Sequence, residues 1–359
     1  MRSKSRFMGA RNVPADHHAA LSPQSVVGRR LLGRGGEALM MREILGERVL
    51  LYRTKAGEAV AMSAICPHRA YPLEQGQRVG DAVQCGYHGF TFGPDGTCLR
   101  VPSQSGVPQK SSLRRYPVVE TAGLVWVWTG DVDMASSAQL PDLAAMGLGR
   151  DDWAVEQHAL VTINARYTLL IENLLDLSHV SFIHATTIPG GEMVASIPVS
   201  VEETAQSITV VRKGQNLPAN PLIKMQFPGQ EDPVNQDFDA EYISPALVRT
   251  GGAMSDAASG RPLGTQNYIH LITPASPTRV HYFVNTARDF AVNNPALGQM
   301  QIAMGTKIQP EDIAAIEAIE LVLQSDATLP TEISARVDNG ALKVRRRLEM
   351  QIKSEQATA

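Results

Sequence analysis

Two short motifs place a cysteine close to a histidine in the first third of the chain. Cys66 and His68 form the first motif, and Cys85 and His88 form the second after 16 intervening residues. Two thiolates and two imidazoles can hold a tetrahedral zinc ion, or a [2Fe–2S] cluster in which two histidines replace two cysteines on one iron. Zinc fingers of the Cys2His2 type usually group both cysteines before both histidines, whereas each motif here contains one of each. The mixed order favours the cluster.

A second group of polar side chains interrupts an apolar segment near the middle of the chain. Burying such groups costs a few kcal/mol each unless they are paired or coordinated, so a shared metal ion would account for them. The group comprises Asn173, Asp176, His179 and His184. At about 100° per residue, an ideal helix would place His184 roughly 140° from His179, so we predict a π-bulge or a helix end between them. The alternative is two core histidines that bind backbone carbonyl groups.

Composition limits the class of protein. With 359 residues, 43% of them hydrophobic and 19% charged, the chain is long enough for two globular domains. A net charge of −3 without a basic stripe argues against a nucleic acid partner. No apolar run approaches about 18 residues and no signal peptide core follows the basic start, so we expect a cytoplasmic protein with no membrane contact.

Only three cysteines occur, and two of them belong to the paired motifs. The chain is therefore not a disulfide scaffold. The third, Cys98, is expected to be a small, partly buried apolar residue.

The sequence pattern predicts three regions. Residues 1–44 show weak periodicity and are expected to form an N-terminal arm. Residues 45–131 are expected to form a small all-β domain that carries the two motifs on loops, because short apolar runs alternate there with turn signals such as Asp95-Gly96. Its predicted strands are residues 48–52, 59–62, 90–92, 97–99 and 124–128.

The third region, residues 132–359, is expected to combine an antiparallel sheet with helices. One helix is predicted from about Arg166 to Ile183. Another is predicted to start at Pro310 and to bury Ile313, Ile316, Ile319 and Leu323 on one face. The remaining predicted elements are strands at 207–213, 238–249, 267–273 and 279–287, and a last helix from about 332 to 352.

Together, the Cys-His motifs and the later histidine segment resemble the oxygenase component of the Rieske non-heme iron oxygenases, in the same order and over most of the chain. The resemblance is greatest to the homotrimeric branch that includes the vanillate and dicamba O-demethylases. It implies an α+β fold, with an N-terminal all-β Rieske [2Fe–2S] domain before a helix-grip-like catalytic domain. It also implies that Cys66, His68, Cys85 and His88 bind the cluster.

The resemblance further implies a mononuclear Fe(II) ion, with O2 as co-substrate, bound by His179, His184 and Asp312. This set would complete a two-histidine, one-carboxylate triad with open positions on the metal. Glu311 is the alternative carboxylate. Without the resemblance, the segment from Pro310 to Asp312 would be read as an ordinary helix start, where acidic residues favour the positive end of the helix dipole.

Catalytic roles for Asp176 and Asn173 are also implied. Asp176 would hydrogen-bond a cluster histidine across a head-to-tail homotrimer and His179 within its own chain, while Asn173 would orient water or O2. A buried amide that satisfies backbone groups is the alternative for Asn173. Further residues could line a pocket or belong to the core, namely Met225, Phe227, His270 and Tyr282.

The implied function is a terminal oxygenase that receives electrons from a ferredoxin and an NAD(P)H-dependent reductase. It would O-demethylate or N-dealkylate a small aromatic compound. Hydroxylation or dihydroxylation of an aromatic is the nearest alternative, since the iron triad is common to all of these reactions. A Rieske electron-transfer protein without oxygenase activity and a zinc-stabilised binding protein are more distant alternatives.

Overall fold

The computed structural model describes residues 24–28, 38–325 and 328–358. Contacts divide the chain into a smaller unit, residues 22–141 with 273–276, and a larger unit that includes residues 142–272 and 277–359. Much of the predicted N-terminal arm lies outside the described residues. Its described parts are strands, β1 (Gln24–Gly28) and β2 (Met40–Ile44).

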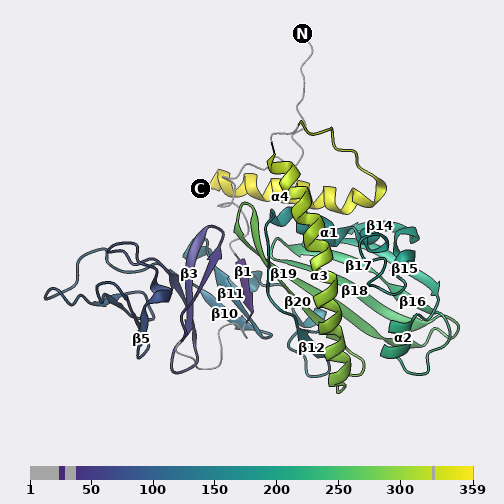
Figure 1. Ribbon diagram of the computed structural model, residues 1–359, viewed down its shortest axis with the longest axis horizontal. Coiled ribbons are helices and arrows are strands. Elements are labelled where there is room, and N and C mark those ends of the chain that lie inside the picture. Colours follow the sequence, from purple (N-terminus) through teal and green to yellow (C-terminus); the bar gives the residue numbers. More distant parts are fainter. Residues whose placement is uncertain (1–23, 29–37, 326–327, 359) are drawn as a thin grey trace, which may run out of the picture. The chain divides into compact units, whose positions relative to one another are not determined.

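In the smaller unit, the described strands form three antiparallel sheets, ordered β1-β11-β10, β2-β3-β4-β9 and β5-β6-β7-β8 (Figure 1). The all-β character predicted for this region is confirmed. Besides β1 and β2, the strands are β3 (Glu47–Arg53), β4 (Ala59–Ser63), β5 (Gln77–Val79), β6 (Ala82–Gln84), β7 (Thr91–Phe92), β8 (Cys98–Arg100), β9 (Arg115–Tyr116), β10 (Val118–Thr121) and β11 (Leu124–Trp128).

The predicted turn at Asp95-Gly96 joins β7 to β8. Gly96 has a φ of +84°, and a Cβ at this position would lie 2.5 Å from the Leu113 carbonyl oxygen, so only glycine suits it. The apolar core of this unit includes both motif cysteines and also Cys98, which is 9% exposed as expected of a small apolar residue.

The larger unit contains a nine-stranded antiparallel sheet, with the path β12-β20-β19-β18-β16-β15-β14 and with β13 and β17 paired beside it. Helix α1 contacts both α3 and α4, and each of the three helices also contacts strands of this sheet (Figure 1). The strands are β12 (Ala154–Gln157), β13 (Val161–Ile163), β14 (Val199–Glu203), β15 (Ile208–Leu217), β16 (Val234–Asp237), β17 (Asp239–Ser244), β18 (Leu247–Asp256), β19 (Pro262–Ser276) and β20 (Arg279–Arg288). The α-helices are α1 (Tyr167–Leu175), α2 (Pro221–Gln226), α3 (Pro295–Gln324) and α4 (Asn339–Thr358).

The single strand predicted at 238–249 is wrong. The chain turns at Pro245 and Ala246, and the two halves form the antiparallel pair β17 and β18. Proline has no backbone N–H for a strand ladder, and the Ser244 hydroxyl accepts a hydrogen bond from the Ala246 N–H at 3.3 Å. Apolar residues on both sides of this turn concealed it in the sequence.

The helix start predicted at Pro310 is also wrong, because α3 begins fifteen residues earlier at Pro295 and includes Pro310 in its interior. The Asn294 side chain caps it by accepting a hydrogen bond from the Leu297 N–H at 3.2 Å. Gly298 and Gly305 weakened the helical pattern in the sequence. Both let other side chains lie close to the α3 backbone, because a Cβ would collide with Glu156 at the first position and with His158 at the second.

The last turns of α3 also differ from the predicted apolar face, since Ile319 is 43% exposed whereas Glu320 is fully buried. Glu320 binds the Arg166 guanidinium through two hydrogen bonds of 2.7 and 2.8 Å and accepts a third from the Arg166 backbone N–H at 3.1 Å. Arg166 precedes α1, so this ion pair ties the start of α1 to α3. In the described residues, no helix is long and apolar enough to cross a membrane.

Glu320→Gln should lower the free energy of unfolding by about 2–4 kcal/mol, because it removes the charge that compensates a largely buried guanidinium. Urea unfolding of the purified protein would measure the shift. The same change at the exposed Glu202 is the control, and an equal effect at the two positions would contradict the importance assigned to the pair.

Candidate metal centres

The two Cys-His motifs lie on loops with the same backbone pattern. The Cys66 N–H donates to the Tyr71 carbonyl at 3.0 Å, and the Cys85 N–H donates to the Phe90 carbonyl at 2.8 Å, five residues on in each case. The residue four after each cysteine, Ala70 or Gly89, has a positive φ and donates its N–H back to the cysteine carbonyl. Two matching turns therefore present the two motifs.

Each motif buries its thiol and exposes its imidazole. Cys66 and Cys85 are 1% and 3% exposed, whereas His68 and His88 are exposed with ring centroids 4.6 Å apart. Phe90 stacks on the His68 ring at 4.7 Å. Burial, and secondarily the neighbouring Cys85 thiol, raise the pKa of Cys66 to about 11. A buried pair of thiols gains from a cation that stabilises the thiolates, so these residues fit a metal cluster.

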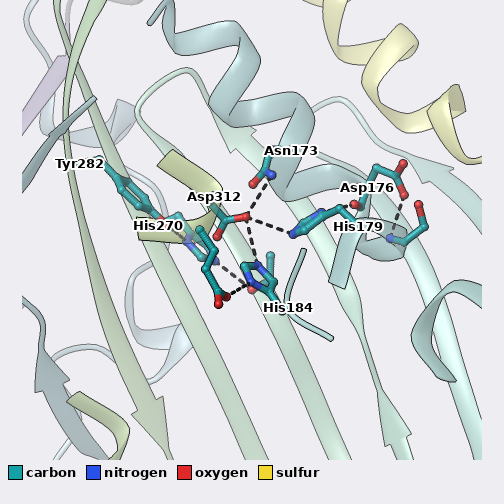
Figure 2. Close-up of polar contacts among 10 residues, drawn as sticks. Asn173, Asp176, His179, His184, His270, Tyr282 and Asp312 are labelled. Atoms are coloured by element: carbon teal, nitrogen blue, oxygen red, sulfur yellow. Dashed lines mark hydrogen bonds and ion pairs between the residues drawn. The ribbon is translucent and has the colours of Figure 1, made fainter. Parts of the chain in front are cut away.

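The structure brings together His179, His184 and Asp312, from segments far apart in the sequence (Figure 2). One ligand atom from each residue lies within 4.8 Å of the others. The Asp312 Oδ1 atom is 3.4 Å from the His179 Nε2 atom and 3.1 Å from the His184 Nε2 atom.

A break in the backbone makes this convergence possible. Helix α1 ends at Leu175, and Asp176 leaves the helical region with φ −111° and ψ 85°. The Asp176 carboxylate then caps the short 3-10 helix Leu177–Ser181 by accepting a hydrogen bond from the Ser178 N–H at 3.0 Å. The 3-10 helix ends before His184, so the predicted helix end between the histidines is confirmed. The continuous helix predicted to Ile183 is wrong.

Both histidines use Nδ1 for an orienting hydrogen bond and direct Nε2 to Asp312. The His179 Nδ1–H donates to the Asp176 backbone carbonyl at 2.6 Å, so this contact does not involve the Asp176 carboxylate. The His184 Nδ1–H donates to the Glu311 carboxylate at 2.7 Å. Glu311 therefore lies behind His184 and orients it. Such contacts leave each Nε2 atom as the metal-binding nitrogen.

The carboxylates around His184 indicate that the site can accommodate a cation. Burial lowers the pKa of His184, but hydrogen bonds and charges from Asp312 and Glu311 outweigh burial and raise it. The carboxylates thus favour a positive charge here, which a divalent cation would supply. The Asn173 amide donates to Asp312 Oδ1 at 3.2 Å, while its own oxygen is buried without a hydrogen-bond partner. That oxygen could accept a hydrogen bond from a water on the metal, so the group fits a mononuclear iron.

A cavity of about 420 Å³ adjoins the three residues, and its lining includes Asn173 and many aliphatic side chains. Of the four pocket residues considered from the sequence, His270 lines it. Met225 is 53% exposed, Phe227 packs on the Phe290 ring at 4.5 Å, and the Tyr282 hydroxyl bonds the His270 ring at 2.7 Å.

Other lining residues were not predicted, because the sequence does not show which face of each strand lies toward the cavity. They include Gln226, Gln266, Tyr268, Met304 and Ile308. The alternation of Gln266, Tyr268 and His270 on one strand was the signal that could have found them.

Comparisons with known families agree with this arrangement. Residues 28–117 match the Rieske [2Fe-2S] domain, and residues 163–354 match the vanillate O-demethylase oxygenase C-terminal domain. The chain is 32% identical to the iron-sulfur subunit of the toluene-4-sulfonate monooxygenase system of Comamonas testosteroni, over 89% of this chain and 93% of the relative.

Two further similarities point the same way. The chain is 29% identical to the oxygenase component of chloroacetanilide N-alkylformylase of Rhizorhabdus wittichii, over 89% of this chain and 92% of the relative. A crystal structure of dicamba monooxygenase bound to 3,6-dichlorosalicylic acid superposes with a TM-score of 0.84 at 25% identity, covering 94% of this chain and 99% of the other. This protein therefore belongs to the vanillate O-demethylase family of Rieske non-heme iron oxygenases and is the oxygenase component of a multicomponent monooxygenase.

Proposed function

We propose that this protein oxidatively dealkylates a small aromatic compound at an iron ion bound by His179, His184 and Asp312. The convergence of these three residues beside a largely aliphatic cavity carries the proposal. Relatives named as vanillate and dicamba O-demethylases and as an N-alkylformylase support removal of an alkyl group. Hydroxylation of an aromatic is the second candidate, favoured by the 32% identity to the toluene-4-sulfonate monooxygenase subunit.

The proposed cluster ligands are Cys66 and Cys85 on one iron and His68 and His88 on the other. Exposed imidazoles suit electron transfer, since a partner protein can approach them. A ferredoxin and an NAD(P)H-dependent reductase are the proposed donors. We further propose a cluster domain over residues 45–131, a catalytic domain over 132–359, an N-terminal arm over 1–44 and a cytoplasmic location.

The residues of the larger unit would prepare the reaction in distinct ways. Bound iron would supply the activation of O2. The Asp176 carbonyl and the Glu311 carboxylate hold the imidazoles in position, and Asn173 orients Asp312 and leaves an amide oxygen for a water molecule. The largely apolar cavity wall would surround a bound substrate mostly with aliphatic side chains. Oxidation of an O-methyl carbon, using O2, two electrons and two protons, gives a hemiacetal that releases formaldehyde and the phenol, with water as the second product.

Asp176 is proposed to link the two centres within a head-to-tail homotrimer. A repeated heterologous contact closes into a ring when the rotation between neighbours is threefold. The Asp176 side chain remains 25% exposed while its backbone carbonyl holds His179, so the carboxylate is available to a histidine of a neighbouring subunit. It also lies 3.7 Å from the buried Arg212 guanidinium.

Asp312→Ala should lose the mononuclear iron and retain the cluster, because only one ligand set is altered. Iron analysis together with the visible spectrum of the cluster would show this. Glu311→Gln is the graded control: it should keep the iron but bind it about 10- to 100-fold more weakly, since His184 loses its carboxylate partner. Full retention of iron by Asp312→Ala would contradict the assigned ligand.

Asp176→Asn should retain both metal centres but lose most turnover, since an amide changes the charge and hydrogen bonding of the proposed link while the His179 contact runs through the backbone. Iron content and the rate of substrate-dependent O2 uptake would be measured on the same preparation. Asp176→Asn with full activity would refute the link. Glu202→Asn, at an exposed site, controls for loss of an acidic residue.

The reaction itself is tested by O2 uptake and aldehyde release with a surrogate ferredoxin and reductase. Methoxybenzoates, methoxybenzamides, N-alkyl anilides and unsubstituted aromatics form the panel. Formaldehyde in proportion to O2 consumed is expected from methoxy compounds. Hydroxylated products without aldehyde would support the second candidate. If no compound of the panel stimulates O2 uptake, the result would favour an electron-transfer protein.

A further inference from the structure

The cavity beside the metal residues contains no lysine or arginine among the described residues that line it. Its acidic residues besides Asp312 are Glu192 and Asp237. Asp237 pairs with Lys213 at 2.9 Å, but the Lys213 ammonium is also 2.8 Å from Asp239, so two carboxylates already neutralise this cation. An aromatic carboxylate or sulfonate would therefore enter the cavity without a cationic side chain to compensate it.

A chain of side-chain hydrogen bonds leads from the buried Arg288 to the cavity wall. The Arg288 Nε–H donates to Gln301 Oε1 at 3.4 Å, and Gln301 Nε2 donates to Gln266 Oε1 at 3.0 Å. Gln266 Nε2 then donates to the Tyr268 hydroxyl. Arg288, Gln301 and Gln266 are each at most 6% exposed, so their partners are fixed by the protein.

Arg288 fixes which group donates and which accepts in each of these hydrogen bonds, because a guanidinium can only donate. Gln301 must turn its oxygen to Arg288 and its amide group to Gln266. Gln226 also donates to Gln266 Oε1, at 2.8 Å, which occupies the second lone pair of that oxygen. Gln266 is thus left with its amide group toward Tyr268. The Tyr268 oxygen accepts, and the hydroxyl hydrogen remains for another acceptor in the cavity that Tyr268 lines.

We infer that the substrate is an uncharged aromatic compound whose carbonyl or amide oxygen accepts a hydrogen bond from the Tyr268 hydroxyl. Tyr268 is then a specificity-determining residue, and Gln266 is a positioning residue that acts through it. The inference rests on the proposed function, because it takes the cavity as the substrate site. It selects aromatic amides and ketones over aromatic carboxylates of the same shape.

The test measures binding to the metal-loaded protein by calorimetry without O2, so that no turnover is required. The probes are 4-methoxybenzamide, the matched anion 4-methoxybenzoate, and methoxybenzene, which lacks the acceptor carbonyl. The amide should bind at least about tenfold more tightly than the carboxylate, because the anion loses hydration without gaining a lysine or arginine partner in the cavity. Equal or tighter binding of the carboxylate would overturn the inference.

Tyr268→Phe should weaken 4-methoxybenzamide binding about 3- to 10-fold and change methoxybenzene binding by less than about twofold, as expected for one neutral hydrogen bond. In turnover, KM for the amide should rise with kcat nearly unchanged. Tyr242→Phe, at a buried tyrosine outside the cavity, is the matched control. An unchanged amide affinity in Tyr268→Phe, or equal weakening of all three probes, would refute the role of the hydroxyl.

The two proposals fail in different ways. If the amide binds preferentially and depends on Tyr268, yet releases no aldehyde, the dealkylation proposal fails and the inference on recognition stands. If aldehyde forms from the carboxylate in preference to the amide, the proposed reaction stands and the inference on recognition fails.

Discussion

The contact between the Asp312 carboxylate and the His184 imidazole joins residues 128 positions apart in the chain. Several other contacts of the larger unit hold these two side chains in place. Carboxylates and imidazoles are costly to bury unless a partner compensates them. Here Glu311 and Asp176 hold the far nitrogens of the two histidines, which leaves both Nε2 atoms facing Asp312. The Arg166–Glu320 pair ties α3, which carries Asp312, to the start of α1.

Buried polar side chains also orient one another at the cavity wall. Arg288 is buried and can only donate, so the amides between it and Tyr268 have one consistent orientation. A largely apolar wall, with no lysine or arginine among its described residues, thereby presents the Tyr268 hydroxyl as a donor. Iron ligands common to a whole family can thus serve different substrates, since recognition depends on a separate set of side chains whose hydrogen-bond direction is fixed from behind the wall.

Two errors in the predicted helices have opposite causes. Gly298 and Gly305 reduce the local helical pattern, yet they let α3 approach Glu156 and His158 closely, so tertiary packing outweighed propensity. With the pattern weakened before it, Pro310 suggested a helix start, because proline is common at the first position of a helix. At Asp176 the opposite occurred: apolar periodicity suggested a continuous helix, and a local carboxylate cap ended it.

From the sequence by itself, the spacing of Cys66, His68, Cys85 and His88 predicted a small metal site of thiols and imidazoles, and the angular offset of His179 and His184 required a π-bulge or a helix end between them. The sequence also indicated the order of the two units. Only the tertiary structure decided that Asp312 meets the histidines with Glu311 behind His184, and that Tyr268 lines the cavity with Gln266 donating to its hydroxyl. Those facts depend on strand register and on helix packing, which are set by contacts between residues distant in the chain and leave little trace in local patterns.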